Sequence, residues 1–480
     1  MPTVDIPFPR SSMPGQRPGE GQGRIINGFC EVDGDVATWR ACPGLAPFVD
    51  TGLGPCRGLI DFNGTLFAAH ANGVARVDLN RKVTTLAGAI GGSGPVTWAH
   101  NNRAPTSDLV AVSDGGAYVV NFASVAAYPP TPVPAGQSGP PAYNLPAPGG
   151  VAPFDGYFLF PIGDGRLFAS NLNSTDVNAL SFTTCQADPD GLLRGVARGS
   201  YFYALGPNSI EVYADAATSP FPLSRVTALK IGLAGPWAIA GQEPGWTPPL
   251  FFVASDCGVY GLDGTSFDRV STKDVERAIQ SVADKSTIRA SVAVVGGNPF
   301  LTLSAPGWTW AYNARTGYWN ERQSYGLSRW RVDQAVKWRG LWIVGDTQSG
   351  RLFELSENAF DEVGQPLALT LESGPIKQFP GRIAVPQADF DFTAGTAPLS
   401  GADDTARPQV GVSWSKDGGG KWGAPVLRPL GGQGEFARRV TVNRCGVSTH
   451  HGMRFRLTSA SPIPRTFRGG RAVVELRGGA

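Results

Sequence analysis

The chain has 480 residues, of which 41 are lysine or arginine and 39 are aspartate or glutamate, so its formal net charge is only +2. A balance this close to zero argues against a dedicated nucleic-acid-binding protein and gives no reason to expect attachment to an anionic membrane surface. With 42% hydrophobic residues alongside 63 glycines and 40 prolines, the composition indicates a folded, turn-rich protein rather than a disordered one.

Signals of export and membrane insertion are missing from the sequence. The first residues contain no basic segment followed by an apolar one, and there is no run of about 18 apolar residues that could span a bilayer. The six cysteines are scattered without a C-x-x-C pair, which favours free thiols in a reducing compartment. We therefore expect a protein without a membrane anchor that is made in the cytoplasm.

A repeated β pattern follows a short N-terminal segment. Residues 1–23 are rich in glycine and proline and predict an extended N-terminal arm. From residue 24 to 362 the chain repeats a short β run, a tight turn containing Gly, Asp or Asn, and a second β run. The copies start at Gly64, Leu109, Gly156, Ser200, Leu250, Phe300 and Gly340. Their spacing of 40 to 50 residues is typical of a β-propeller with four strands per blade. We expect about seven blades; six blades plus an irregular unit, or a sandwich of unrelated hairpins, are the alternatives.

Two segments interrupt this repeat. Residues 129–150 contain eight prolines and predict an extended insertion between the second and third units. Residues 272–284 predict a helix, which residues 271–274 (STKD) would open as a capping box. Its apolar face would consist of Val275, Ala278, Ile279 and Val282. We expect this single helix to serve packing, with contact to a partner as the alternative.

The repeat ends near residue 362, and residues 363–480 contain β-rich runs at longer spacing, which predict a separate antiparallel β-sandwich. The end of this region is basic, with nine arginines against a single acid, Glu475, between residues 438 and 477. Such a stretch is either a solvated face whose arginine stems cover apolar surface, or a patch that faces nucleic acid or an acidic protein. The candidate DNA- or partner-facing residues are Arg438, Arg439, Arg454, Arg456, Arg468 and Arg471.

Sequence patterns of catalysis are also missing. There is no P-loop, no H-E-x-x-H and no G-x-S-x-G in a strand–turn–helix context. Adjacent His450 and His451 would point to opposite faces of a strand, so we expect no metal site there, and we identify no catalytic or cofactor-binding residue. Residues 415–422 (SKDGGGKW) resemble the Asp-box of sialidases, a motif that closes a hairpin by capping its turn. We expect a protein that is not an enzyme.

Five short segments occur in an informative order. They are residues 41–45 (ACPGL), 199–206 (GSYFYALG), 208–213 (NSIEVY), 230–235 (KIGLAG) and 453–458 (MRFRLT). In this order they resemble the packaged-DNA-stabilisation proteins of short-tailed bacteriophages (podoviruses), also called tail hub or nozzle proteins. The resemblance extends over nearly the whole chain, but the Pro-rich segment and the N-terminal arm depart from the family pattern.

The resemblance implies a structural protein of the virion tail that is assembled in the host cytoplasm. It would form a homohexameric ring below the portal and head-to-tail adaptor. Such a ring continues the DNA channel, retains packaged DNA and anchors tail fibres, spikes, a needle or a plug. Double-stranded DNA would pass through the lumen without sequence-specific contacts. Two other functions remain compatible with the residues alone: a propeller that binds other proteins, and a carbohydrate- or receptor-binding tail protein.

Overall fold

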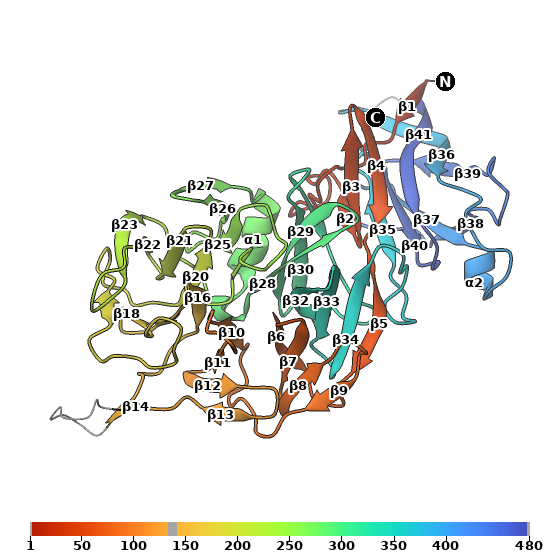
Figure 1. Cartoon of the computed structure of the whole chain (residues 1–480). Coiled ribbons are helices and arrows are strands. Elements are labelled where there is room, and N and C mark those ends of the chain that lie inside the picture. Colours follow the sequence, from red (N-terminus) through yellow and green to blue (C-terminus); the bar gives the residue numbers. More distant parts are fainter. Residues whose placement is uncertain (1, 133–141, 478–480) are drawn as a thin grey trace.

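The computed structural model describes residues 2–132 and 142–477. It consists of a β-propeller and a β-sandwich placed side by side (Figure 1), which confirms the predicted all-β fold class. The first and the last strand of the chain, β1 and β41, both belong to the sandwich.

Seven blades of four antiparallel strands form the propeller, as the repeat predicts. Blades 1 to 6 use strands that are consecutive in the chain: β6–β9, β10–β13, β16–β19, β20–β23, β24–β27 and β28–β31. Blade 7 combines β32, β33 and β34 with β5, which comes from the start of the propeller, and this pairing closes the ring.

The bounds of the propeller strands are β5 (Gly44–Asp50), β6 (Cys56–Phe62), β7 (Thr65–His70), β8 (Gly73–Val77), β9 (Val83–Thr85), β10 (Thr97–His100), β11 (Leu109–Ser113), β12 (Gly116–Val120), β13 (Val125–Ala127), β16 (Ala152–Phe154), β17 (Tyr157–Pro161), β18 (Arg166–Ala169), β19 (Phe182–Thr184), β20 (Arg194–Arg198), β21 (Tyr201–Leu205), β22 (Ile210–Asp215), β23 (Leu223–Leu229), β24 (Ile239–Ala240), β25 (Leu250–Val253), β26 (Val259–Asp263), β27 (Ser266–Arg269), β28 (Arg289–Val295), β29 (Asn298–Ala305), β30 (Trp308–Asn313), β31 (Tyr318–Glu321), β32 (Val332–Trp338), β33 (Leu341–Asp346) and β34 (Arg351–Ser356).

Two-residue turns set the register of several blade hairpins. Asn63 and Gly64 join β6 to β7 with φ values of 51° and 76°, and Asp155 and Gly156 join β16 to β17 with 47° and 85°. Positive φ at both central residues defines a type I′ turn, whose twist matches that of the strands it joins. Asn, Asp and Gly tolerate this conformation, so these dipeptides mark the hairpins in the sequence.

The first strand of each blade lies nearest the propeller axis. First strands contact one another at the junctions β32/β6, β6/β10, β10/β16, β16/β20, β24/β28 and β28/β32. Because every blade is an antiparallel meander, these first strands all run in the same direction along the axis. Their starting ends therefore meet at one mouth of the central channel.

The sandwich packs two sheets over a core that includes Phe390, Phe455 and Phe467. One sheet has the order β3-β4-β41-β36-β39, with β1 also paired to β41, and the other has the order β2-β35-β40-β37-β38. The bounds are β1 (Thr3–Asp5), β2 (Arg24–Ile26), β3 (Gly28–Asp33), β4 (Val36–Ala41), β35 (Leu369–Glu372), β36 (Arg382–Phe392), α2 (Asp403–Ala406), β37 (Gln409–Ser415), β38 (Val426–Pro429), β39 (Val440–Val447), β40 (Arg454–Ser459) and β41 (Thr466–Arg477).

The N-terminal residues are distributed differently from the sequence-based domain boundaries. Residues 24–41 form β2, β3 and β4, which pair with sandwich strands, so the propeller does not begin at residue 24. The described part of the arm, residues 2–23, also packs on the sandwich: β1 pairs with β41, Ile6 is buried and Phe8 packs 4.6 Å from Phe467. The twelve-residue strand β41 is long enough to pair with β1, β4 and β36, and this explains the recruitment of the N-terminal strands.

One continuous sheet joins the two parts. Strand β2 pairs with β31 of blade 6 on one side and with β35 of the sandwich on the other, so the blade and a sandwich sheet form nine strands in succession. Arg24 reinforces the joint through three hydrogen bonds to Glu321, from Nε to Oε1 at 2.8 Å and to Oε2 at 3.0 Å and from Nη2 to Oε2 at 2.6 Å. Buried Arg465 of the sandwich donates from Nη2 to the carbonyl oxygen of Phe360, in the segment between β34 of the propeller and β35, at 3.1 Å. The propeller and the sandwich are thus held as a single unit.

The two interruptions of the repeat occur where expected. The Pro-rich segment contains the short strands β14 (Thr131–Pro132) and β15 (Ala142–Tyr143), and its centre, residues 133–141, lies outside the described residues. Helix α1 (Lys273–Ser281) falls within residues 272–284 and is followed by the 3-10 helix η1 (Lys285–Thr287). The predicted capping box is wrong, because the Thr272 side chain makes no cap hydrogen bond and the Ser271 hydroxyl donates to Glu276 instead, at 2.9 Å.

Candidate interaction surface

The structure separates the six candidate arginines of the sandwich instead of gathering them in one patch. Arg454 is buried and donates a hydrogen bond to the carbonyl of Gly21 in the N-terminal arm, and burial lowers the pKa of this guanidinium. Arg456 donates from Nε to Glu372 at 2.8 Å, and its guanidinium lies 3.9 Å from the centre of the Trp422 ring. Arg454 therefore does not face DNA or a partner on the surface of this chain, and Arg456 is engaged within it.

Arg468 and Arg471 are exposed but already paired with carboxylates. Arg468 donates to Asp391 at 2.8 Å, and Arg471 donates to Asp5 of β1 at 2.9 Å. Exposed pairs of this kind contribute little stability, between about 0 and 1 kcal/mol. Their charges are also neutralised locally, which weakens any attraction for a distant anion.

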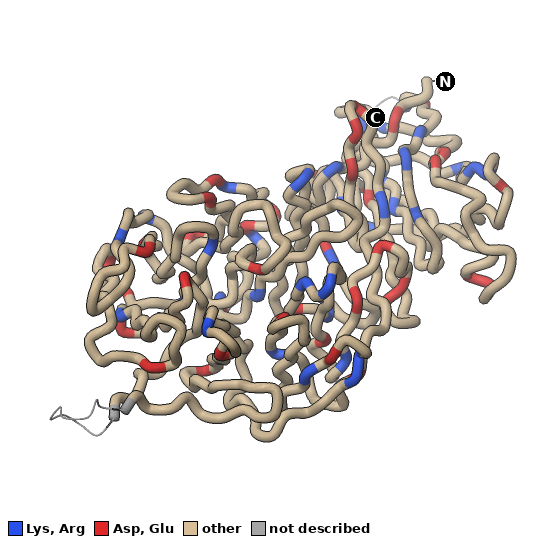
Figure 2. Tube along the Cα trace, in the orientation of Figure 1, with Lys and Arg blue, Asp and Glu red and all other residues tan. Residues whose placement is uncertain are grey.

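Three exposed arginines keep an unpaired charge at β39, an edge strand of the sandwich. Arg438 and Arg439 lead into β39, and Arg444 lies within it at φ 58°. None of the three forms an ion pair with another residue in the described part of the chain. We call these three residues the basic edge. Elsewhere basic and acidic residues alternate over both parts of the molecule (Figure 2).

The Asp-box closes the loop between β37 and β38. Ser415 donates to Asp417 at 2.7 Å and accepts from the backbone N–H of Gly419 at 2.8 Å, while Asp417 accepts from the N–H of Lys421 at 2.9 Å. Burial opposes ionisation of Asp417, but these hydrogen bonds outweigh it and lower the pKa of the carboxyl. The same loop holds the N-terminal arm, since the N–H of Gly19 donates to the carbonyl of Gly418 at 2.8 Å. The motif is therefore a structural device here.

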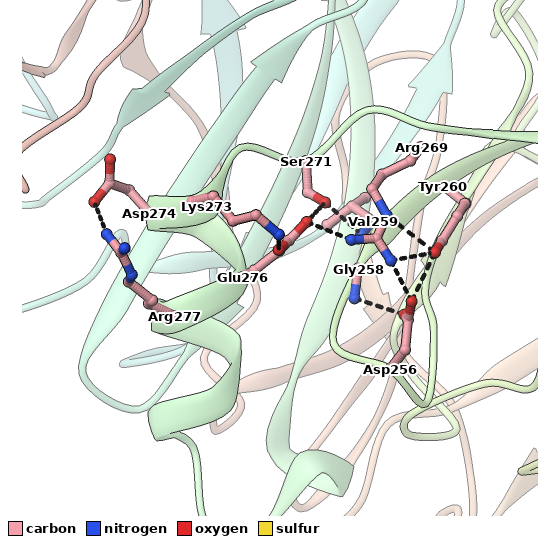
Figure 3. Close-up of polar contacts among 10 residues, drawn as sticks. All are labelled: Asp256, Gly258, Val259, Tyr260, Arg269, Ser271, Lys273, Asp274, Glu276 and Arg277. Atoms are coloured by element: carbon pink, nitrogen blue, oxygen red, sulfur yellow. Dashed lines mark hydrogen bonds and ion pairs between the residues drawn. The ribbon is translucent and has the colours of Figure 1, made fainter.

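A second polar cluster fastens helix α1 to blade 5 (Figure 3). Glu276 is buried and accepts hydrogen bonds of 2.9 Å from Ser271, Lys273 and Arg269. Burial acts to raise the pKa of Glu276, but its donors prevail and lower it. Arg269 also bonds Asp256 and the hydroxyl of Tyr260, and this hydroxyl mainly accounts for the raised pKa of Arg269. The cluster satisfies its own members, which favours packing as the role of the helix.

The described residues offer few groups suited to metal binding, membrane insertion or nucleophilic catalysis. No cluster of three or more His, Cys, Asp or Glu side chains could hold a metal ion, and no helix is both long and apolar enough to cross a membrane. All six cysteines are free in the described structure, and burial raises the pKa of Cys56 to about 12 and that of Cys445 to about 11. Thiols with such pKa values are poor nucleophiles at neutral pH.

The fold and these surfaces define a protein built of a β-propeller and a β-sandwich, with three unpaired arginines at one exposed edge of the sandwich. The sequence profile of the bacteriophage P22 Gp10 β-propeller matches residues 31–360, and that of the P22 Gp10 β-sandwich matches residues 380–475. The chain therefore belongs to the bacteriophage P22 Gp10 family of structural phage tail proteins, which confirms the resemblance seen in the sequence.

Comparisons with curated sequences and with solved structures give no further information about function. No curated protein sequence matches the chain. Among solved structures, that of a streptogramin B lyase is 10% identical and covers 65% of this chain and 96% of its own, with a TM-score of 0.41.

Proposed function

We propose that this protein is the tail hub of a short-tailed phage. Six copies would form a ring below the portal and head-to-tail adaptor, continue the DNA channel, retain packaged DNA and anchor fibres, spikes, a needle or a plug. The observation that carries the proposal is the match of both the propeller and the sandwich to one family of structural phage tail proteins. The host cytoplasm is the place of assembly in this proposal.

The way in which the propeller and the sandwich are joined supports a structural role in a tail. Blade 6 and the sandwich share one nine-stranded sheet, and β5 closes the propeller from the N-terminal side. A subunit built in this way has its two parts joined by backbone hydrogen bonding across a shared sheet. A wall around DNA must also release it, and many phosphate contacts would hold the DNA in a salt-dependent way. The net charge of +2 is consistent with a wall that makes few such contacts.

We further propose that the basic edge faces a neighbouring subunit or another tail protein. Its three arginines are exposed and carry no ion pair within the described chain, so a partner's carboxylates would gain three charge-assisted contacts. Binding of such a partner would break no ion pair that already exists within this chain. Arg468 and Arg471, in contrast, would have to exchange Asp391 and Asp5 for the partner.

The test is negative-stain microscopy of the purified protein, alone and mixed with a portal–adaptor complex from the same genome. A six-fold ring, or added density coaxial with the adaptor, supports the tail hub. A monodisperse monomer that ignores the portal complex, or a trimer that binds sugars or cells, contradicts it. Light scattering at several protein concentrations checks that a monomer is not simply a diluted ring.

A further inference from the structure

One sheet of the sandwich carries opposite charges at its two edges. In the order β3-β4-β41-β36-β39, the edge strands are β3 and β39, and they lie on opposite sides of the sandwich (Figure 1). The basic edge lies at β39. The hairpin that joins β3 to β4 consists of residues 33–36 (DGDV) and carries Asp33 and Asp35. We call these four residues the acidic tip.

The acidic tip extends beyond the packed part of the molecule. At the base of the hairpin, Phe29 packs 5.2 Å from Phe300 of blade 6. The tip itself is exposed, and the side chain of Val36 is 65% exposed. A Cβ atom placed on Gly34 would meet no atom of the described residues within 4 Å, apart from those of its chain neighbours. The tip is therefore open to contact by another chain.

Both patches hold charges that are not paired within the described chain. Neither Asp33 nor Asp35 forms an ion pair, and Arg40, the next cation along the hairpin, is paired with Glu31 at 2.5 Å. Beside the basic edge, the side chain of Glu435 accepts a backbone hydrogen bond of 3.2 Å, and the three arginines outnumber it. One edge thus offers carboxylates and the other a surplus of guanidinium groups.

The two patches lie at similar heights along the strands. Trp39 of β4 pairs with Phe467 of β41, which pairs with Phe392 of β36. Two residues further along β36, Phe390 pairs with Val440 at the start of β39, and the tip begins three residues from Trp39 in the same direction. Counted along the strands, the two heights differ by about one residue, or about 3.3 Å. A copy displaced sideways in the plane of the sheet would therefore bring its acidic tip to the basic edge.

The form of the contact follows from the state of β39. Arg428 donates from Nε to the carbonyl oxygen of Thr441 at 2.8 Å, and Arg444 interrupts the extended backbone with a φ of 58°. Such features block the addition of a strand to an edge. The contact would consequently be made by side chains, with exposed apolar groups available on both patches, Val36 at the tip and Phe436 (75% exposed) before the basic edge.

We propose that the acidic tip of one copy binds the basic edge of a second copy of this chain. Two different patches of one chain form a head-to-tail interface, and such an interface generates a ring when the rotation between copies closes. Carboxylate–guanidinium contacts are charge-assisted and restrict which surfaces can meet. The inference rests on the proposed six-copy ring and names the surfaces that neighbouring subunits would use in it.

The test is charge reversal, with assembly of the full chain measured by light scattering and negative-stain microscopy, alone and on the portal–adaptor complex. One variant carries Asp33→Lys and Asp35→Lys, a second changes the three basic-edge arginines to Glu, and a third combines both sets. The control carries Asp263→Lys and Asp268→Lys, which change two exposed acids of the β26–β27 hairpin by the same charge. Circular dichroism and melting curves establish that each variant is folded.

Each single reversal should weaken association at least about tenfold, because like charges would then meet, while the control should stay within about threefold of wild type. The combined variant should recover association to within about threefold of wild type, and an equimolar mixture of the two single reversals should form rings of alternating subunits. Failure of both the combined variant and the mixture to restore assembly, or an equal loss in the control, overturns the proposal.

A second measurement does not depend on the folding of the reversals. The Arg439→Lys variant, assembled and treated with a carbodiimide, should become linked to Asp33 or Asp35 of another copy, as identified by mass spectrometry. Assembled rings without this link contradict the contact. A wild-type chain that stays monomeric alone and on the adaptor overturns the ring and the contact together, whereas a wild-type ring that is insensitive to the reversals overturns the contact alone.

Discussion

Replacing Glu276 by Gln should loosen helix α1 from blade 5 while leaving the rest of the propeller intact. The side chain of Glu276 is 8% exposed, whereas those of Arg269 and Lys273, its charged partners, are 41% and 76% exposed. Solvent screening limits each ion pair to about 0.5 kcal/mol. Loss of charge also weakens the bond from the Ser271 hydroxyl by about 0.5 kcal/mol. We therefore expect the variant to lose about 1.5 kcal/mol of local stability.

Hydrogen exchange measured by mass spectrometry is the appropriate assay, since a chain of two joined domains need not unfold in two states. Amides of α1 should exchange roughly tenfold faster in Glu276→Gln, because 1.4 kcal/mol is a factor of ten in an opening equilibrium. The matched control is Asp274→Asn, which removes only the 3.4 Å pair with Arg277 and should change exchange by less than about threefold.

The pH dependence of the Glu276→Gln effect tests independently whether the charge of Glu276 stabilises helix α1. The pKa of Glu276 is lower in the folded protein than in the unfolded chain, so its stabilisation is complete above the unfolded value and disappears as the pH falls through the folded one. The difference between wild type and Glu276→Gln should accordingly shrink as the pH falls below about 4.3, the ordinary value for Glu, and vanish once the pH lies below the lowered pKa of the folded protein. An effect no larger than that of Asp274→Asn, or one that persists unchanged in acid, would refute the reasoning.

Three further outcomes are expected. Changing all three basic-edge arginines to Glu should weaken ring assembly at least about tenfold by light scattering, whereas Arg471→Glu should leave it intact, and equal effects would contradict a role for the edge. Ile6→Ala should destabilise the sandwich by about 2 kcal/mol, measured as faster hydrogen exchange in β41, and unchanged exchange would show that the N-terminal arm is dispensable. Asp417→Ala should cost about 1 kcal/mol and expose residues 418–421 to limited proteolysis, which unchanged cleavage would contradict.

The sequence predicts the blades well because six of the seven blades are built from strands that are consecutive in the chain. A hairpin signal recurs with every unit, and turns such as those at Asn63 and Asp155 fix the strands on either side. The domain boundary at residue 24 differs from the structure because pairing between β2 and β35, or between β4 and β41, joins residues more than 300 positions apart. No local pattern in residues 24–41 distinguishes a sandwich strand from a blade strand.

Arginine density in the sequence is likewise a poor guide to surface charge. Arg438 and Arg454 belong to the same basic stretch, yet one is exposed and the other 4% exposed beneath the N-terminal arm. Burial of Arg454 depends on Gly21, far away in the chain.

The first 50 residues complete both parts of the molecule. Strands β1 and β4 pair with β41, β2 connects blade 6 to the sandwich, and β5 supplies the last strand of blade 7. Every one of these pairings joins sequence positions separated by more than 290 residues. Loop-closure entropy must be overcome before such distant contacts stabilise the chain, so closure of the ring and completion of the sandwich should be late and mutually dependent steps of folding. The N-terminal strands are thus incorporated into both the propeller and the sandwich. The same pairings that join the two parts in the folded protein are the ones expected to form late in folding.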